Sequence, residues 1–336
     1  MAQGRDLSER QTYEAVASVM TGEATDALIA SFLTGLRVRG ETADNLAGAV
    51  AAARDHSVGW PDDSRLGPVL DTCGTGGDGA CSVNISTAAA IVVAASGVAV
   101  AKHGNRSASG NSGSAEVLVE LGIAIEAEPP VLVRCLRELK ITFLYAPKFH
   151  PALRFAAPSR RQLPFRTLFN LVGPLANPAR PTHQLIGVPN PDVADLMAQA
   201  VAKLGTTRAA VVSGSDGLDE VCLGGDTVVR WVENGEVVSK TWPIEAFGLG
   251  SVRPEQLRVS GPSESAEAIR DLLGGKPGPV RSTVLANAAA GLLVAGAVSD
   301  LAEGVERAAQ AIDDGLAASL LGRWAALSQE GSQSSS

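Results

Sequence analysis

Short apolar segments that alternate with helix-length segments constrain this chain more than any other feature of its sequence. The segments with the length and composition of buried strands are 68–71, 98–102, 141–145 and 209–213. The intervening segments with helical patterns are 86–95, 131–139 and 192–204. Strands and helices in alternation form a largely parallel sheet that helices cover on both faces. We therefore expect an α/β fold with a mostly parallel central sheet.

Helical patterns flank this region on both sides. Apolar residues recur at helical spacing from Leu28 to Leu36, Gly40 is expected to end that helix, and the next begins near Thr42. The Gly- and Pro-containing segment 56–68 predicts a linker, and Asn234–Gly235 predicts a hairpin. Residues after 263 are Ala-rich and helical in pattern. We expect a small helical domain over 1–65, an α/β domain over 66–330 and a disordered tail over 331–336.

The net charge of −8 argues against a nucleic-acid binder, which needs a basic face. The four cysteines form no CxxC pair, and we expect reduced core thiols. The first fifteen residues contain no apolar signal segment, and Ser96 and Gly97 interrupt the long apolar stretch that begins at Ala88. These features predict a cytoplasmic protein that binds neither nucleic acid nor membrane.

A glycine-rich segment, Asp71–Gly79, follows the first predicted strand. Glycines there let the backbone turn sharply and let its amides hold a phosphate. Gly74, Gly76 and Gly79 also match the dinucleotide pattern GxGxxG. That interpretation requires an acidic residue about 20 positions further on. The chain has Val98–Lys102 there, so a phosphate-binding loop is favoured over a dinucleotide site or a bare turn.

Two polar segments follow. Ser82–Thr87, with the letters SVNIST, precedes an apolar helix, which fits simple helix capping, although a hydroxyl such as that of Ser86 can also coordinate a hard cation. Lys102–Ser114 combines two cations with many small donors, which suits an anionic, oxygen-rich ligand as well as a solvated loop. Ligands of open α/β sheets bind at the carboxyl ends of strands, and two such loops at successive strand ends favour a site.

Two charged pairs complete the candidate site. Asp219 and Glu220 follow the strand predicted over 209–213; such pairs often face solvent, but carboxylates together with substrate phosphates are also how proteins hold Mg²⁺. Arg160 and Arg161 are also compatible with a solvated face. An anionic aromatic substrate would need one such guanidinium, which binds a carboxylate as a planar fork.

Together these motifs resemble the anthranilate phosphoribosyltransferase family. The resemblance rests on GTGGDG, NIST, KHGNRSASG, FLYAP-x-x-HPAL, RT-x-FN-x-x-GPLANPA and GLDE, and it extends over roughly residues 10 to 320. It implies a small helical domain, with a return contribution near 155–182, on a larger domain of the nucleoside phosphorylase type. It also implies a homodimer and a role in tryptophan biosynthesis. Gly110–Asn111, Glu116 and Pro164 depart from the family pattern.

The resemblance implies a role for each matching position. Phosphoribosyl diphosphate (PRPP) would be bound by Gly74, Gly77, Asp78, Ser82, Asn84, Ile85, Ser86, Thr87, Lys102, His103, Gly104, Asn105, Arg106, Ser107, Ala108, Ser109, Gly110 and Ser114. Anthranilate would contact Gly74, Asn105 and Arg160, and Mg²⁺, with two ions per monomer, would be held by Ser86, Asp219 and Glu220. No residue is expected to act as a catalytic acid or base.

The reaction implied is displacement of diphosphate from C1′ of the ribose by the amine of anthranilate. We hypothesise that two separate domains close over the site and exclude water. The nearest alternative is a pyrimidine nucleoside phosphorylase of the same fold, against which KHGNR and the paired arginines argue. A nucleic-acid-binding relative would lack the GLDE carboxylates, and a dinucleotide-dependent oxidoreductase is disfavoured by Lys102.

Overall fold

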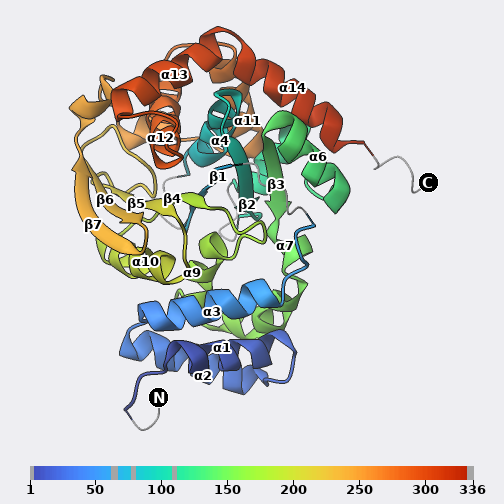
Figure 1. The fold of residues 1–336 in the computed structure, drawn as a ribbon. Coiled ribbons are helices and arrows are strands. Elements are labelled where there is room, and N and C mark those ends of the chain that lie inside the picture. Colours follow the sequence, from blue (N-terminus) through green and yellow to red (C-terminus); the bar gives the residue numbers. More distant parts are fainter. Residues whose placement is uncertain (1–3, 62–66, 77–80, 108–111, 331–336) are drawn as a thin grey trace.

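A computed structural model describes residues 4–61, 67–76, 81–107 and 112–330. At its centre lies a seven-stranded sheet in the order β3-β2-β1-β4-β5-β6-β7 (Figure 1). Neighbours among β1 to β5 are parallel, whereas β6 and β7 are antiparallel additions at one edge. The strands are β1 (Val69–Gly74), β2 (Ala99–Gly104), β3 (Ile141–Tyr145), β4 (His183–Gly187), β5 (Arg208–Gly214), β6 (Thr227–Glu233) and β7 (Glu236–Trp242). The expected mostly parallel α/β sheet is confirmed.

The chain begins with three helices that lie at one end of the molecule, α1 (Glu9–Met20), α2 (Asp26–Arg39) and α3 (Ala43–Asp55) (Figure 1). Gly40 ends α2 with a φ of +86°, a conformation that favours glycine. Thr42 caps α3, and its hydroxyl accepts from the amide of Asn45 while the Asn45 side chain accepts from the amide of Thr42. Both predicted boundaries are confirmed.

Each face of the sheet packs against its own set of helices. On one face, Leu185 and Val212 belong to a core shared with α4, α12, α13 and α14. On the other face, Ile186 and Val211 belong to a core shared with α1–α3, α9 and α10. The helices after α3 are α4 (Ile85–Ala95), α5 (Ser114–Glu120), α6 (Pro129–Leu139), α7 (Ala146–Phe149), α8 (Ala157–Gln162), α9 (Leu168–Leu175), α10 (Pro191–Lys203), α11 (Pro262–Leu273), α12 (Pro279–Val294), α13 (Leu301–Asp313) and α14 (Leu316–Ser328). The 3₁₀ turns are η1 (Pro151–Ala156), η2 (Ile244–Phe247) and η3 (Pro254–Leu257).

The sequence pattern predicted the hairpin correctly but did not predict one strand, β4. Asn234 and Gly235 join β6 to β7 with φ of +51° and +84°, as a tight hairpin turn requires, so that prediction is confirmed. Strand β4 is not among the predicted strands. It begins with His183 and Gln184, polar residues that are nevertheless buried, and therefore lacks a continuous apolar run.

Other expectations have mixed outcomes. All four cysteines are outside disulfides and three are buried, but Cys81 is exposed, so the expectation of core thiols is wrong for that residue. Cys81 has a φ of +51°, and its side chain is exposed, whereas Val83 two residues further on is buried in the core. Among the described residues, no helix has the length and apolar character needed to span a membrane. The predicted tail, 331–336, lies outside the described residues.

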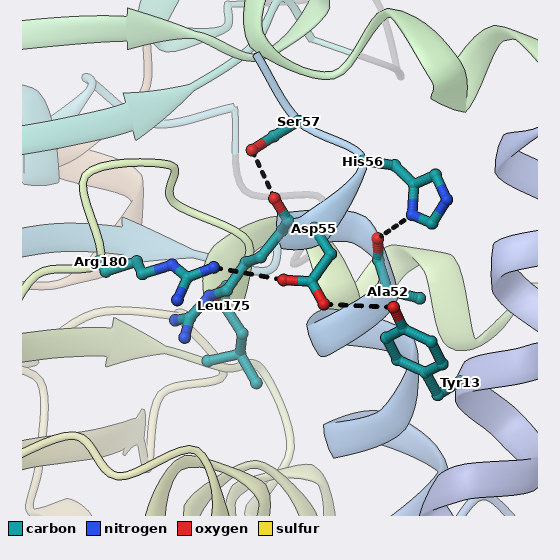
Figure 2. Close-up of polar contacts among 8 residues, drawn as sticks. Tyr13, Ala52, Asp55, His56, Ser57, Leu175 and Arg180 are labelled. Atoms are coloured by element: carbon teal, nitrogen blue, oxygen red, sulfur yellow. Dashed lines mark hydrogen bonds and ion pairs between the residues drawn. The ribbon is translucent and has the colours of Figure 1, made fainter. Parts of the chain in front are cut away.

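Polar contacts join the end of α3 to the chain that follows α9 (Figure 2). Arg180 binds Asp55 at 3.3 Å, Tyr13 of α1 donates to the other Asp55 oxygen at 3.2 Å, and Ser57 Oγ donates to Arg54 O at 2.6 Å. The side chain of Arg54 donates to Leu175 O at 3.0 Å. Burial and the nearby charge of Arg180 lower the pKa of Arg54 to about 10. Helices α1 and α3 are thus tied to the loop that leads into β4.

The contact between α1 and α3 depends on a glycine. A Cβ atom on Gly48 of α3 would lie 2.2 Å from Glu9 O and 3.0 Å from the Tyr13 amide nitrogen, both in α1. We expect Gly48→Ala to push the helices apart and to lower the free energy of unfolding by about 1–3 kcal/mol, as overpacking does. Urea unfolding of the purified protein measures this.

Gly322→Ala is the matched control, because Gly322 lies within α14 and a Cβ atom added there would have no neighbouring atom within 4 Å. Alanine there should raise stability by roughly 0.5–1 kcal/mol through helix propensity. Equal stability of the two variants would show that α1 and α3 do not pack as closely as described.

Candidate active site

The glycine-rich segment turns away from the sheet at the end of β1. Thr75 N donates to Gly187 O at 2.9 Å, and Gly76, with a φ of +63°, directs its amide at Asp219 Oδ2, 2.8 Å away. A Cβ on Gly74 would lie 2.7 Å from the same carboxylate oxygen. The segment therefore needs glycine at Gly74 for space and at Gly76 for its backbone conformation. Gly77 and Asp78 lie outside the described residues.

The carboxyl ends of β1 and β4 form the centre of the site. Gly74 is paired with Gly187, and a Cβ on Gly187 would lie only 1.6 Å from Asp219 O. Two neighbouring strand ends thus lack side chains, and the loop after β5 lies directly over them. From β1, the strands that follow in the chain, β2 and β3, are added on one side of the sheet, whereas β4 and β5 are added on the other side, so the direction of the strand order reverses between β1 and β4. Ligands of open α/β sheets bind at such a switch point.

The first turn of α4 lies beside the same carboxylates. Ser86 N donates to Glu220 Oε1 at 3.3 Å, and Lys102 Nζ donates to Ser86 Oγ at 3.2 Å. Asn84, at the N-cap, makes no side-chain cap; its side chain binds Ser112 and Ser265. The interpretation of this segment as simple capping is therefore wrong for Asn84.

Other members of this segment have different surroundings. Ile85 is buried in the core, so only its backbone can contact a ligand, and Thr87 is also buried. Ser82 is half-buried and bridges to Arg258. The segment therefore offers backbone amides and the hydroxyls of Ser82 and Ser86 at the helix N-terminus, where partial positive charge favours an anion.

Ser86, Asp219 and Glu220 fit a hard divalent cation. They supply one hydroxyl and two carboxylates, brought together by hydrogen bonds from the amides of Gly76 and Ser86. No group of three His, Cys, Asp or Glu able to hold a metal exists within the described ranges. A cation here would need additional oxygens from a ligand, which is the way Mg²⁺ is commonly bound.

Lys102 lies on β2, within the strand predicted over 98–102, and its side chain is buried beneath the site. Its ammonium group is buried and donates to Thr72 O as well as to Ser86 Oγ. Burial lowers its pKa, and the neighbouring Asp71 opposes that effect. Asp71 is itself fully buried, which raises its pKa to about 6, and it accepts hydrogen bonds from His103 N at 3.1 Å and Asn177 Nδ2 at 2.9 Å. These bonds join β1, β2 and the loop after α9.

His103 is neutral at pH 7. Burial and the nearby His150 lower its pKa to about 3, and its Nδ1–H donates to Gly173 O at 3.1 Å. The His103 and His150 rings pack edge to face with centroids 5.2 Å apart. His103 therefore provides shape and a hydrogen-bonding nitrogen, but no positive charge for a phosphate.

The described residues on either side of 108–111 contact one another and the end of β3. Arg106 Nε donates to Tyr145 Oη at 3.1 Å, Ser107 N approaches the Glu116 carboxylate at 3.3 Å, and Ser114 Oγ donates to Asn105 O at 3.3 Å. Gly104 has no room for a side chain, because a Cβ would lie 2.3 Å from Ser114 Oγ. Ala108, Ser109 and Gly110 lie outside the described residues.

The paired arginines of α8 line an open pocket of about 450 Å³ together with Phe165, Arg166 and Asn170. Arg160 is half-buried, its guanidinium lies 5.7 Å from the centre of the Phe169 ring, and burial lowers its pKa. Arg161 is exposed. The two neighbours therefore differ in exposure, and the guanidinium of Arg160 is the one that is partly shielded from bulk water.

Three features of the site were absent from the sequence interpretation. Gly187 ends the strand that the apolar pattern did not predict. Asp71 appeared in the sequence only as the start of the glycine-rich segment. Arg166 donates to Thr75 O at 2.8 Å and to Gly76 O at 2.5 Å. Its place in the RT-x-FN motif was the one available signal.

Comparison with known proteins decides the family. The helical-bundle domain of a glycosyl transferase family matches residues 1–57, and the a/b domain of a glycosyl transferase family matches residues 66–318. A protein of Thermomicrobium roseum named anthranilate phosphoribosyltransferase is 48% identical, over 97% of this chain and 94% of the relative. The chain belongs to the anthranilate phosphoribosyltransferase family.

Solved structures of this family agree with the fold. Anthranilate phosphoribosyltransferase from Thermus thermophilus superposes with a TM-score of 0.91 at 41% identity, covering 97% of both chains. The Saccharomyces cerevisiae enzyme in complex with PRPP and Mg has a TM-score of 0.87 at 27% identity, covering 96% of this chain and 94% of its own. Another structure of the yeast enzyme contains 4-fluoroanthranilate.

The neutral His103 predicts a dependence of stability on acid. An unfolded histidine gains a proton near pH 6.5, whereas folded His103 does so near pH 3. The unfolded state therefore binds more protons in this window, and this contribution to stability is lost as pH falls from 6.5. His103→Asn keeps a donor for Gly173 O and removes the titration. Between pH 7 and pH 4, we expect the variant to lose about 3 kcal/mol less stability than the parent.

Urea unfolding of both proteins at the two pH values measures the difference. Groups that titrate between pH 7 and pH 4 and do not contact His103 behave alike in both proteins and cancel in the comparison. Equal losses would mean that His103 is solvated or already charged in the folded protein.

Proposed function

We propose that this chain transfers the phosphoribosyl group of PRPP to the amine of anthranilate at the carboxyl edge of β1 and β4, releasing diphosphate. The observation that carries this proposal is the convergence of Gly76, Ser86, Asp219 and Glu220 over the two side-chain-free strand ends. The family to which the chain belongs supports the choice of substrates.

The diphosphate end of PRPP needs donors and a counterion. We assign these to Gly74, Gly77 and Asp78 of the glycine-rich segment and to the first turn of α4, with Ser82, Asn84 and Thr87 beside that turn. The segment Lys102–Gly110, which comprises the end of β2 and the start of the following loop, would contact the remaining oxygens together with Ser114. Lys102, buried behind Ser86, would act through its charge from below the site.

Ser86, Asp219 and Glu220 would hold Mg²⁺. When bound, Mg²⁺ neutralises charge on the diphosphate and so favours its departure as a leaving group. The protein's contribution is to fix these oxygens in advance, through the Gly76 and Ser86 amides, so that little rearrangement is needed during the reaction.

The anthranilate carboxylate would bind Arg160, with Gly74 and Asn105 beside the ring. An aromatic amine is neutral at pH 7, so its lone pair is available without a strong base. The sugar passes through an oxocarbenium-like state as diphosphate leaves, and the amine must already be close to C1′. Positioning of the second substrate by Arg160 therefore supplies much of the rate.

Finer features are part of the same proposal. We propose two Mg²⁺ ions per monomer, a homodimer and a location in the cytoplasm. We further propose a helical domain over 1–65 with a contribution near 155–182, which is supported by the contacts of α8 and α9 with α2 and α3. The α/β domain would comprise 66–330.

Mg²⁺ should be required for activity, and a chelator should abolish it. If each lost carboxylate weakens binding by about 1.4 kcal/mol, Asp219→Asn with Glu220→Gln should raise the Mg²⁺ needed for half-maximal activity about a hundredfold. The loss of anthranilate fluorescence in the presence of PRPP follows the reaction. Full activity of the double variant at low Mg²⁺ would disprove the metal assignment.

Arg160→Ala should weaken the binding of anthranilate much more than the binding of PRPP. Loss of a charge-assisted hydrogen bond costs roughly 1.5–3 kcal/mol, which corresponds to about a ten- to hundredfold higher KM for anthranilate. The KM for PRPP should change much less. Lys at 160 should restore binding only in part, because an ammonium cannot form the planar fork.

Arg161→Ala is the matched control, since it removes the same charge from an exposed neighbour in the same pocket. Steady-state kinetics with each substrate varied in turn measures both variants. If Arg161→Ala raised the anthranilate KM and Arg160→Ala did not, the carboxylate assignment would move by one residue.

A further inference from the structure

The peptide unit between Thr75 and Gly76 lies between a cation and a carboxylate. Its carbonyl oxygen accepts a hydrogen bond from Arg166 Nη2 at 2.8 Å, and its N–H donates to Asp219 Oδ2 at 2.8 Å. A trans peptide directs these two groups to opposite sides. The peptide dipole is therefore aligned between the positive Arg166 and the negative Asp219.

Arg166 makes a second bond that fixes this arrangement. Its Nη1 donates to Gly76 O at 2.5 Å, so that one planar guanidinium holds two successive carbonyl groups. Hydrogen bonds of ionised groups are stronger than neutral ones, and bonds in series polarise one another. Gly76 has a positive φ, and glycine can adopt many other backbone conformations at little cost. Without the guanidinium, the Thr75–Gly76 peptide has fewer constraints on its rotation.

Arg166 reaches this peptide from the segment that lines the Arg160 pocket. The next residue, Thr167, is the N-cap of α9, and the side-chain oxygen of Asn170 accepts a hydrogen bond from Thr167 N at 2.9 Å. Helix α9 packs on α3, which anchors the segment. One side chain thus connects the pocket assigned to anthranilate with the loop that contacts Asp219.

We propose that Arg166 is a positioning residue that sets the orientation of the Asp219 carboxylate through the Thr75–Gly76 peptide. The structural part stands on the contacts alone, and the consequence for Mg²⁺ rests on the proposed function. Arg166 acts through the backbone, and it fixes the orientation of the Asp219 carboxylate already in the protein without substrates. Arg166 lines the pocket assigned to anthranilate, and from there it fixes the orientation of Asp219, a proposed Mg²⁺ ligand.

The amide of Gly76 reports this orientation in the ligand-free protein. Thr labelled with ¹³C at the carbonyl and Gly labelled with ¹⁵N give signals only from Thr–Gly pairs, which are Thr21–Gly22, Thr34–Gly35 and Thr75–Gly76. Asp219→Ala assigns the Gly76 signal. In Arg166→Ala, we expect that signal to shift toward its position in Asp219→Ala and to exchange with solvent about tenfold faster, as loss of a charge-assisted bond predicts.

Two variants control for charge and for shape. Arg161→Ala removes the same charge from the same pocket, but Arg161 is exposed and is not the arginine that holds the described residues 74–76, so the Gly76 signal should stay in place. Arg166→Lys keeps the charge without the fork and should give an intermediate shift. An unchanged Gly76 signal in Arg166→Ala, with the Gly22 and Gly35 signals also unchanged, would overturn the proposal.

Kinetics test the consequence for the metal. Arg166→Ala should raise the Mg²⁺ needed for half-maximal activity about tenfold, with less than about a twofold change in the anthranilate KM. In an Asp219→Asn background the same change should have almost no further effect, because the two residues act through one peptide. An equal factor in both backgrounds would overturn the coupling. An inactive parent would instead refute the proposed function, while the amide signal would still decide the positioning role.

Discussion

The close approach of Asp219 to two strand ends is the constraint on which the rest of the site depends. The backbone oxygen of Asp219 occupies the space of a side chain at Gly187, and its carboxylate occupies that space at Gly74. Because these glycines are paired across β1 and β4, the loop after β5 can cross the switch point of the sheet at van der Waals distance. Any side chain at either position would lift the carboxylates away from Ser86 and from the glycine-rich segment.

A buried polar layer keeps those strand ends in register. Asp71 accepts from the backbone of β2 and from Asn177, while Lys102 of β2 donates back to Thr72 O. Burying both charges is costly, and only pairing and hydrogen bonds offset that cost. A displacement of β1 relative to β2 would break these hydrogen bonds and leave buried charges uncompensated, so it is strongly unfavourable. The layer also accounts for the burial of Lys102, the last residue of the strand predicted over 98–102.

Features that depend on interactions within a few residues could be predicted from the sequence. Features that depend on contacts between distant segments could not. Asn234–Gly235, Gly40 and Thr42 act within a few residues of themselves, so their turns and caps follow from the sequence. Strand β4 does not, because His183 and Gln184 are buried by neighbours distant in sequence. The motifs around Gly74, Ser86 and Asp219 predicted a phosphate and metal site, but the order of strands that brings them together is not contained in any one of them. Arg166, an exposed residue in a short connection, carried no pattern that points to Thr75.

The arrangement of the two apolar cores limits how this site can close. Val16 and Leu33 of the first helices share one core with Ile186 and Val211 of the sheet. A rigid rotation of the helical region would have to break that core, at a cost of about 25 cal/mol for each Å² of apolar surface exposed. The exposed ion pair of Arg180 with Asp55 adds little resistance, since such pairs contribute about 0–1 kcal/mol. Closure of two domains over the site stays a prediction, and such a motion would have to proceed without exposing this shared core.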